Sequence, residues 1–381
     1  MRLLVLTAFY PIPGVTHERM FVHVRNRYYQ EHGADVTVLN FAAQEDYAVD
    51  GIPVITLHTF EQNHGKYDIV LSHSANVRNH YHFLKKHQGE FKRFVFFFHG
   101  HEASMFAKDY PQPYAFSPDG KLTKRVFQYA YDLFKLNVWR SFYKFLAPRS
   151  QFVFVSECFY KRALANMSLK PEDLQGHCHV IHNSIGAFFE NAEYAPERKK
   201  DFDFICIRSN LDASKYCVDL FVALARKYPS KKFLLIGKGE LFKFIAKPAN
   251  LEWVDHTLDH EAMLSYLNDA KCGVMLTRSD TQGVMACEMA SIGMPLLSSD
   301  IEVCHEILDK LPNVALVPND VEKIDLDAIY ERLAAGLPYP KCRLYFAEET
   351  ICKEMRLFHA MLEDQRQAAR ASAERGASPV S

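Results

Sequence analysis

Two acidic residues, Asp280 and Glu288, stand eight positions apart in the stretch 278–308, RSDTQGVMACEMASIGMPLLSSDIEVCHEIL. The residues just before them, 271–277 (KCGVMLT), are apolar and fit a buried strand of a parallel sheet. Apolar spacing after Asp280 indicates a helix over 281–292, which ends before a glycine and a proline. We therefore expect Asp280 at the carboxyl end of a strand and Glu288 about two turns into the next helix, at the edge where open α/β sheets bind ligands.

The residue types around these acids suit a bound nucleotide sugar. Glu288 lies on an apolar helix face, where an unpaired acid is costly to bury, so it needs hydrogen-bond donors such as ribose hydroxyls. Gln282, Gly283 and Val284 offer free N–H groups at the helix start, and Gly283 allows close approach of a phosphate or sugar. For Asp280 the alternative role is capping of the helix N-terminus.

The elements that carry these residues form two similar units. Short β-branched and aromatic runs alternate with helical stretches over 1–189, which indicates parallel βαβ units. A polar interval at 190–203 (ENAEYAPERKKDFD) breaks the alternation, which resumes over 201–343. A last helical segment falls within 344–367, and the small, polar residues 368–381 indicate a disordered tail. The sequence predicts two doubly wound α/β domains that face each other across a cleft.

Composition limits the class of protein. The 381 residues carry a net charge of -1, with 48% hydrophobic and 24% charged residues, which is ordinary for a globular chain. Nine cysteines are scattered without a C-x-x-C pair, which favours reduced, buried thiols and no zinc site. No run approaches the ~20 apolar residues of a membrane span, and the first residues fit a strand and turn better than a signal peptide. We expect a cytoplasmic protein.

Cations and a histidine follow other strands. Arg208, Asn210 and Lys215 come after the strand FICI, where fixed cations would stabilise the charge of a diphosphate leaving group; solvated surface cations are the alternative. His99 ends the strand in FFFHGHE and could orient an acceptor or stabilise positive charge, although a lone histidine is more often structural. Gly237 lies in GKGE, for which a plain tight turn is an equal alternative.

The stretch from 280 to 307 resembles the E-x7-E signature of retaining glycosyltransferase family 4, whose members have the GT-B fold of two Rossmann-like domains. Asp280 stands where the family usually has its first Glu, Gly283 matches the motif glycine, and Glu288 is the second Glu. The resemblance covers the carboxyl-terminal domain well and the amino-terminal domain loosely. The shorter Asp280 is a departure that affects how the hydroxyls of the donor hexose would be held.

The resemblance also assigns roles outside the signature. Lys215 matches the lysine of the family segment G-R-L-x-x-x-K, whereas Asn210 occupies the arginine position and Arg208 lies two residues earlier. Gly14 resembles the glycine-rich loop after the first strand. The expected catalytic residues are His99, Asp280, Lys215 and Arg208, and the expected donor-binding residues are Gly14, Asn210, Gly237, Gln282, Gly283, Val284 and Glu288.

What the resemblance implies is a retaining, metal-independent hexosyltransferase without a cofactor. The donor would be a nucleotide diphosphate sugar, UDP-linked by preference with GDP-mannose as the alternative, and the acceptor a glycan or lipid-linked saccharide, as in bacterial surface polysaccharide or lipopolysaccharide synthesis. The amino-terminal domain would bind the acceptor, the carboxyl-terminal domain the donor, and the last helix would cross back to the first domain. The alternatives are a GT-B-fold sugar-nucleotide epimerase or phosphorylase, and a catalytically degenerate binding partner in a glycan-assembly complex.

A basic, aromatic segment, Lys121–Arg149, needs its own explanation. It holds seven Lys or Arg against one Asp, together with eight aromatic residues. Such a helix suits an anionic bilayer surface, which would place the protein on the inner face of the cytoplasmic membrane. An ordinary helix packed on the sheet is the alternative. Nucleic acid is not an expected partner, because the rest of the chain has no matching basic field.

Overall fold

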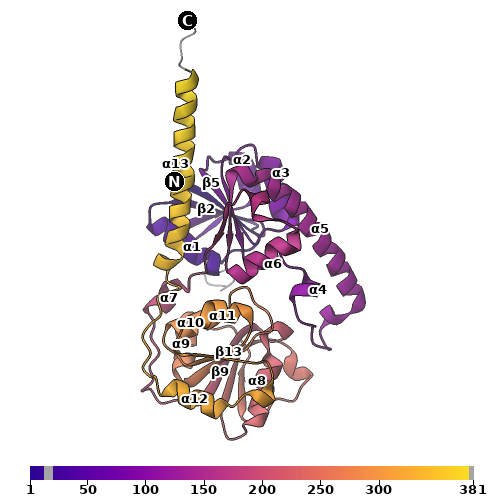
Figure 1. Cartoon of the computed structure of the whole chain (residues 1–381), viewed down its shortest axis with the longest axis vertical. Helices are drawn as coiled ribbons and strands as arrows, with labels where there is room; N and C mark the ends of the chain where they lie inside the picture. The colour runs from indigo at the N-terminus through magenta and orange to yellow at the C-terminus, as the bar shows by residue number, and fades with distance from the viewer. Residues whose placement is uncertain (13–19, 377–381) are drawn as a thin grey trace.

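A computed structural model describes residues 1–12 and 20–376, and the side chains of 1–12 and 20–363. The chain forms two α/β domains, one above the other in Figure 1. The strands of the first domain are β1 (Arg2–Thr7), β2 (Asp35–Asn40), β3 (Tyr47–Val49), β4 (Ile52–Ile55), β5 (Ile69–His73), β6 (Phe94–Phe98), β7 (Ser150–Phe154) and β8 (Cys178–Val180). Their order is β3-β4-β2-β1-β5-β6-β7-β8, and only the β3–β4 pair is antiparallel.

Helices cover both faces of this sheet because successive strand residues point to opposite sides. Leu4 and Phe96 share one core with Trp139, whereas Leu3 and Phe97 contribute to the other. The helices are α1 (Met20–Glu31), α2 (Leu57–Asn63), α3 (His82–His87), α4 (Phe106–Asp109), α5 (Leu122–Leu146), α6 (Glu157–Met167) and α7 (Gly186–Asn191).

The second domain is a parallel six-stranded sheet in the order β11-β10-β9-β12-β13-β14. Its strands are β9 (Phe202–Asn210), β10 (Phe233–Lys238), β11 (Leu251–Val254), β12 (Ala270–Met275), β13 (Leu296–Ser299) and β14 (Val314–Val317). Its helices are α8 (Val218–Lys227), α9 (His260–Asn268), α10 (Val284–Ser291), α11 (Glu302–Leu308) and α12 (Leu326–Ala334). The predicted pair of doubly wound domains is confirmed. In each sheet the strand order reverses beside the first strand, which creates a ligand-binding crevice at the carboxyl ends.

The last helix, α13 (Ile351–Gly376), packs on the first domain rather than the second (Figure 1). Ile351 and Phe358 enter the core beside β1, and the buried carboxylate of Glu354 accepts a hydrogen bond from Arg25 of α1 at 2.9 Å. The helix continues past residue 367, where the sequence predicted a disordered tail. Residues 368–376 are mostly Ala, Arg and Glu, which are strong helix formers.

Most of the basic, aromatic segment Lys121–Arg149 forms α5, and only part of this helix packs on the sheet. Trp139, Phe142 and Tyr143 are buried, as the packed-helix alternative requires. The first half projects from the domain and exposes large apolar side chains, including Phe127, which is 78% exposed, and Phe134, 57% exposed. Within the described part of the chain, no helix is long and apolar enough to span a bilayer.

Candidate active site

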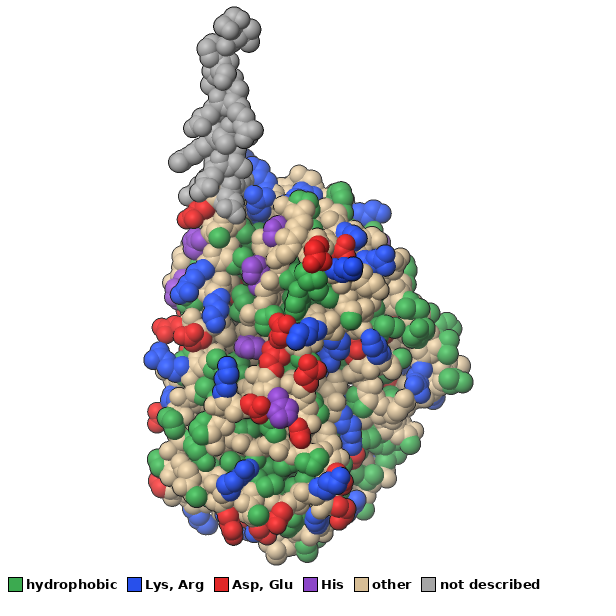
Figure 2. Space-filling model, in the orientation of Figure 1, with side chains coloured by type: hydrophobic (Ala, Val, Ile, Leu, Met, Phe, Trp, Pro, Cys, Tyr) green, Lys and Arg blue, Asp and Glu red, His purple; other side chains and the backbone are tan. Residues whose placement is uncertain are grey.

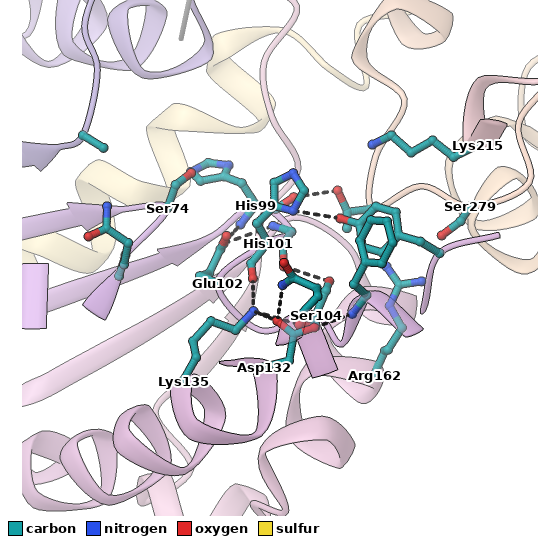
Figure 3. Close-up of a pocket in the computed structure, with 18 of the residues that line it drawn as sticks. Ser74, His99, His101, Glu102, Ser104, Asp132, Lys135, Arg162, Lys215 and Ser279 are labelled. Atoms are coloured by element: carbon teal, nitrogen blue, oxygen red, sulfur yellow. Dashed lines mark hydrogen bonds and ion pairs between the residues drawn. The ribbon is translucent and has the colours of Figure 1, made fainter. Parts of the chain in front are cut away.

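A cavity of about 440 Å³ separates the two domains at the carboxyl ends of β5, β6 and β12, and we call it the interdomain cavity. His99 and Arg162 line it from the first domain, and Lys215 and Asp280 line it from the second. Figure 3 shows Lys215 across the space from the polar cluster that surrounds His99. The cavity therefore joins predicted catalytic residues from both halves of the chain.

A second cavity, of about 470 Å³, continues into the second domain, and we call it the β9–α10 cavity. Asp280 lines both cavities, so it stands at their junction. The predicted donor-binding residues that line the second cavity are Gly237, Gln282, Gly283 and Val284, and Arg208 lines it as well. Sequence positions from 208 to 284 thus meet around one space.

Asp280 is held over the start of α10. Its Oδ1 accepts a hydrogen bond from the N–H of Thr281 at 2.8 Å. The helix begins at Val284, after an N-cap at Gly283, so residues 281–283 form a loop and not the first turn that the sequence predicted. A Cβ on Gly283 would lie 3.4 Å from Oδ2 of Asp280, so the glycine keeps the carboxylate close to the helix start. Backbone N–H groups at the start of α10 and the carboxylate of Asp280 therefore lie close together.

Glu288 lies one turn after Val284 on the same face of α10. Its side chain is half-buried, and desolvation raises the pKa of its carboxyl to about 8. Among the described residues, no group donates a hydrogen bond to this carboxyl. Such a group is costly to leave without donors, so hydroxyls of a bound molecule would improve its environment.

Arg208 is buried beside the β9–α10 cavity. One terminal nitrogen donates to the carbonyl of Leu276 at 2.5 Å, and its guanidinium lies 5.0 Å from the ring centroid of Tyr216. No carboxylate in the described ranges pairs with it. An arginine that is fixed but not neutralised can stabilise negative charge on a ligand in the cavity.

Lys215 lies on the short helical turn between β9 and α8, and its side chain lines the interdomain cavity. Its ammonium lies 4.6 Å from the ring centroid of Tyr216 and 5.4 Å from that of Tyr110. The backbone is held from the end of β12, because its carbonyl accepts from the N–H of Arg278 at 2.8 Å and from Oγ1 of Thr277 at 3.0 Å. Lys215 forms no ion pair with any described residue, so its charge is also available.

His99 ends β6 on the first-domain side. Its Nε2 shares a 3.1 Å hydrogen bond with Nδ1 of the buried His73, and its carbonyl accepts from Oγ1 of Thr281 at 2.7 Å. The carboxylate of Glu102 accepts hydrogen bonds from the backbone N–H groups of His99 and Gly100. These contacts fix the histidine at the junction of the two domains.

Other contacts fix the 280–282 loop against the first domain. The side-chain amide of Gln282 bonds both the N–H and the carbonyl of Asn183, at 2.6 and 3.1 Å. Arg162 donates to the carbonyl of Asp280 at 3.1 Å, and Oγ of Ser156 donates to that of Thr281 at 2.6 Å. Gln282 therefore joins the domains as well as lining the cavity, a role that its position before a helix did not indicate.

One predicted donor-binding residue, Asn210, stands apart from the others. The side chain of Asn210 is exposed, and its Oδ1 accepts from the N–H of Asp212 at 2.9 Å. It lines a third cavity, of about 370 Å³, which shares Lys215 with the interdomain cavity. Gly14 lies outside the described residues. The structure therefore does not bring Asn210 to the other predicted donor-binding residues.

Sequence reasoning missed part of the first-domain wall. Lys135 is buried, and its ammonium donates to the carbonyls of His101 and Ser104 at 2.8 and 2.9 Å and to Asp132 at 2.9 Å. These bonds hold the loop after β6 against α5 (Figure 3). The one acid within the basic segment was the available signal, since an Asp three residues before a Lys can pair on one helix face.

Part of the sequence and the whole fold are similar to known proteins. Residues 204–334 match the family of glycosyl transferases group 1. Solved structures with a similar fold include sucrose-phosphate synthase from Thermosynechococcus elongatus, with 13% identity, a TM-score of 0.70, and coverage of 95% of this chain and 99% of that one. A trehalose-6-phosphate structure from E. coli bound with UDP-2-fluoro glucose has 13% identity, a TM-score of 0.53 and 100% coverage of both chains.

A third similar structure is an alpha,alpha-trehalose-phosphate synthase (UDP-forming) from Burkholderia xenovorans in complex with glucose-6-phosphate. It has 12% identity and a TM-score of 0.57, and covers 94% of this chain and 99% of that one. No curated protein sequence matches the chain. The GT-B fold is confirmed, and so is the resemblance of the second domain to glycosyltransferases; nothing in these matches assigns the chain to family 4 in particular.

Proposed function

We propose that this chain, whose second domain matches the glycosyl transferases group 1, is a retaining hexosyltransferase that uses a nucleotide diphosphate sugar. The observation that carries the proposal is the approach of two cations, Arg208 and Lys215, to the Asp280 loop without a carboxylate partner among the described residues. Fixed, unneutralised cations suit a diphosphate leaving group. The charge that they supply fits a transfer step that is independent of a metal ion.

The donor would occupy the β9–α10 cavity. Free N–H groups at Gly283 and Val284 suit a phosphate, and the carboxyl of Glu288, one turn further, suits the ribose hydroxyls. Asp280, at the junction of the cavities, would hold hydroxyls of the hexose. We favour UDP over GDP as the nucleotide, and the UDP-2-fluoro glucose in one similar structure supports this choice.

In the transfer step, the bond between the anomeric carbon and the diphosphate oxygen breaks as a bond to the acceptor oxygen forms on the same face of the sugar. The leaving phosphate oxygen takes the acceptor's proton, so no protein nucleophile is needed. Lys215 and Arg208 stabilise the charge that grows on the diphosphate. His99, fixed by His73 and Thr281, would face the positive charge that develops at the sugar.

The acceptor would enter the interdomain cavity, and α5 suggests that it is lipid-linked. Gln128 and Tyr131 of α5 line this cavity, while Phe127 and Phe134 of the same helix are exposed. Figure 2 shows hydrophobic side chains gathered on the projection that α5 forms at the right of the molecule. Exposed basic residues flank them, namely Lys121, Lys124 and Arg140. An anionic membrane surface fits both features and would bring a lipid-linked saccharide beside the cavity.

This arrangement fits a protein at the inner face of the cytoplasmic membrane that takes part in surface polysaccharide or lipopolysaccharide synthesis. Not all of the basic segment serves such a surface. Lys135 is buried in its pair with Asp132, and Lys144 forms a 2.7 Å ion pair with Asp173. The relevant surface, which we call the exposed half of α5, is therefore the exposed first half of this helix together with Arg140, which is exposed in its second half.

The test is incubation of the purified protein with UDP-, GDP- and ADP-hexoses and with short glycans, lipid-linked saccharides or glucose-6-phosphate. Release of nucleoside diphosphate together with a product of unchanged anomeric configuration, read by NMR, is the expected result. Conversion of the donor hexose without an acceptor would indicate an epimerase. Nucleotide binding without turnover across the panel would indicate a catalytically degenerate binding partner.

A further inference from the structure

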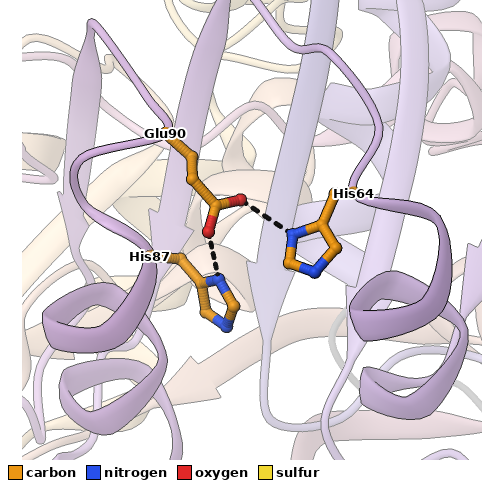
Figure 4. A group of neighbouring side chains, drawn as sticks. All are labelled: His64, His87 and Glu90. Carbon is orange, nitrogen blue, oxygen red and sulfur yellow. Dashed lines mark hydrogen bonds and ion pairs between the residues drawn. The ribbon is translucent and has the colours of Figure 1, made fainter.

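Three potential metal ligands meet on the first domain, far from the cavities described above. His64 follows α2, His87 ends α3, and Glu90 lies in the turn that leads to β6. One ligand atom from each lies within 4.8 Å of the other two, and no other such group occurs among the described residues. Figure 4 shows both imidazoles turned toward the same carboxylate.

The two histidines approach Glu90 through the same ring atom. Nδ1 of His64 lies 2.9 Å from one carboxylate oxygen, and Nδ1 of His87 lies 2.7 Å from the other. The rings pack at a centroid distance of 5.5 Å, and each also contacts Phe60. His64 caps α2 with a backbone φ of 38°, an uncommon conformation that turns its side chain back toward His87.

The buried histidine has a ring nitrogen that this hydrogen bonding leaves unsatisfied. His87 is 2% exposed, and its Nε2 has no hydrogen-bond partner, although a carboxylate oxygen of Glu61 lies 3.9 Å away. In the neutral tautomer of His87 that donates from Nδ1 to Glu90, the lone pair of Nε2 points toward the carboxylate of Glu61, which is unfavourable. If a cation binds at Nδ1 instead, the proton moves to Nε2, and this N–H can donate toward Glu61.

We propose that His64, His87 and Glu90 bind a divalent transition-metal ion, with zinc the best fit. Two imidazole nitrogens and one carboxylate oxygen form an N₂O donor set, which zinc accepts together with a water molecule. Ligand atoms on one tetrahedral zinc lie ~3.4 Å apart, so small side-chain adjustments are sufficient. With the metal bound, Glu61 would be the outer carboxylate that accepts from Nε2 of His87, which now lies 3.9 Å away.

Local charge favours occupancy by a cation. Both oxygens of the Glu90 carboxylate face imidazole nitrogens, at 2.9 Å from Nδ1 of His64 and 2.7 Å from Nδ1 of His87. The ammonium of Lys86, on the neighbouring helix α3, is paired with Glu61 at 2.5 Å, and no Lys or Arg among the described residues forms an ion pair with Glu90. A negative carboxylate beside two imidazoles is a suitable set of ligands for zinc, an ion of borderline hardness.

This metal would have a structural role and no part in sugar transfer. The three residues lie at the amino ends of β5 and β6, whereas the interdomain cavity lies at their carboxyl ends. Five residues of strand separate the two edges by ~16 Å. The ion would tie the end of α2 to the turn after α3 and so fix the entries to both strands. The proposal is therefore independent of the proposed transferase activity.

The test uses untagged, full-length protein that has been stripped with a chelator and then titrated with Zn²⁺ by calorimetry, with Co²⁺ as a spectroscopic probe. Wild type should bind one Zn²⁺ per chain, give visible Co²⁺ bands and gain thermal stability. His64→Gln and Glu90→Gln change half-exposed side chains, so both variants should fold, and each should bind Zn²⁺ at least tenfold more weakly. Glu61→Gln should weaken binding by about 10- to 100-fold.

His58→Gln is the matched control, because His58 is an exposed histidine of the same helix α2. It should bind Zn²⁺ as wild type does. Absence of one-to-one binding in wild type, or equal binding by His64→Gln, Glu90→Gln and wild type, would overturn the proposal. Nucleotide-sugar binding should be unaltered in every variant, so failure here leaves the transferase proposal intact.

Discussion

Gly237 lies against the backbone of Arg208: a Cβ at position 237 would stand only 1.8 Å from the carbonyl oxygen of Arg208. Gly237 has a φ of 142°, and the pairing of β9 with β10 shifts register at this point. The glycine thus allows the end of β9, which carries Arg208, to approach β10. The sequence offered a tight turn as an equal explanation of GKGE, but this residue lies within the strand.

Gly237→Ala should therefore disturb both the fold and the position of Arg208. We expect overpacking to lower the free energy of unfolding by about 1–3 kcal/mol. The affinity for nucleotide should also fall, by more than in a glycine variant far from the cavity. Thermal unfolding and nucleotide titration measure the two effects. Gly89→Ala is the control, because a Cβ there meets nothing within 4 Å. Equal behaviour of the two variants would contradict this account.

Glu288→Gln should separate stability from function. The carboxyl of Glu288 has a pKa raised from 4.5 to about 8 in the fold, so the folded protein binds more protons between these values. The contribution of Glu288 to the free energy of unfolding is therefore greatest below pH ~4.5, where its carboxyl is protonated in both states, and it is lost as the pH rises through 8. The melting temperature of the variant relative to wild type should thus increase from pH 5 to 9, by roughly 2–4 °C for each kcal/mol.

The same variant should lose donor binding and turnover, because an amide accepts fewer hydrogen bonds from ribose hydroxyls than a carboxylate does. Donor affinity of wild type should rise from pH 6 to 9 as the carboxyl ionises, and that of Glu288→Gln should stay flat. Calorimetric titration with a nucleoside diphosphate measures both profiles. Full affinity and activity in the variant would mean that Glu288 does not contact the donor.

Lys215→Ala should slow the chemical step more than it weakens binding, because charge grows on the diphosphate as the glycosidic bond breaks. Loss of one such contact typically lowers kcat by about 10²- to 10³-fold. The comparison needs kcat at saturating donor together with the donor Kd. Lys310→Ala serves as a control, since this lysine is exposed and lines neither cavity. An unchanged kcat in Lys215→Ala would leave Arg208 as the only catalytic cation proposed.

The fold could be predicted from the sequence because its signals are local and repeated. Apolar runs such as FFF before His99 alternate with helical stretches, and a parallel sheet brings the carboxyl ends of its strands to one edge. That rule placed Lys215 and Asp280 at one edge of the second sheet, and the expectation of two domains that face each other across a cleft placed His99 opposite them. The helix after Asp280 began later than predicted, since apolar periodicity does not reveal how many residues the preceding loop takes.

What the sequence could not show depends on contacts across the cleft. Nothing local distinguishes Asn210, which points to solvent, from Arg208, which lies under Tyr216. Likewise, Arg162 contacts the Asp280 loop only because α6 packs against it. The Arg162–Asp280 contact joins residues 118 positions apart, and spacing along the chain carries no information about it.

Glu306 links the domains through a charge. Its carboxylate accepts hydrogen bonds from the N–H groups of Glu157 and Cys158 at 2.6 and 2.8 Å, at the start of α6 in the other domain. A carboxylate at a helix N-terminus is stabilising, so Glu306→Gln should favour a more open arrangement of the domains. We expect a larger radius of gyration by X-ray scattering and a severalfold higher KM for donor. Glu331→Gln, on exposed α12, should change neither value.

The exposed half of α5 should bind anionic vesicles. Each basic residue near such a surface contributes ~1 kcal/mol, and Lys124, Arg125 and Arg140 are not buried in the fold. Wild type should sediment with vesicles that contain anionic lipid and less with neutral ones. Raising the salt concentration should weaken binding without abolishing it, because salt screens the charges but not the apolar contribution that Phe127 and Phe134 make to the binding free energy.

Two sets of variants distinguish the charge from the apolar side chains. Reversing Lys124, Arg125 and Arg140 to Glu should remove the salt-sensitive part, whereas Phe127→Ser should remove much of the salt-resistant part. Both should retain transfer to a short soluble acceptor, because these side chains lie outside the interdomain cavity. Loss of transfer to a lipid-linked acceptor alone would tie the surface to acceptor delivery. If wild type ignores anionic vesicles at low salt, the exposed half of α5 serves another partner and the acceptor is a soluble saccharide.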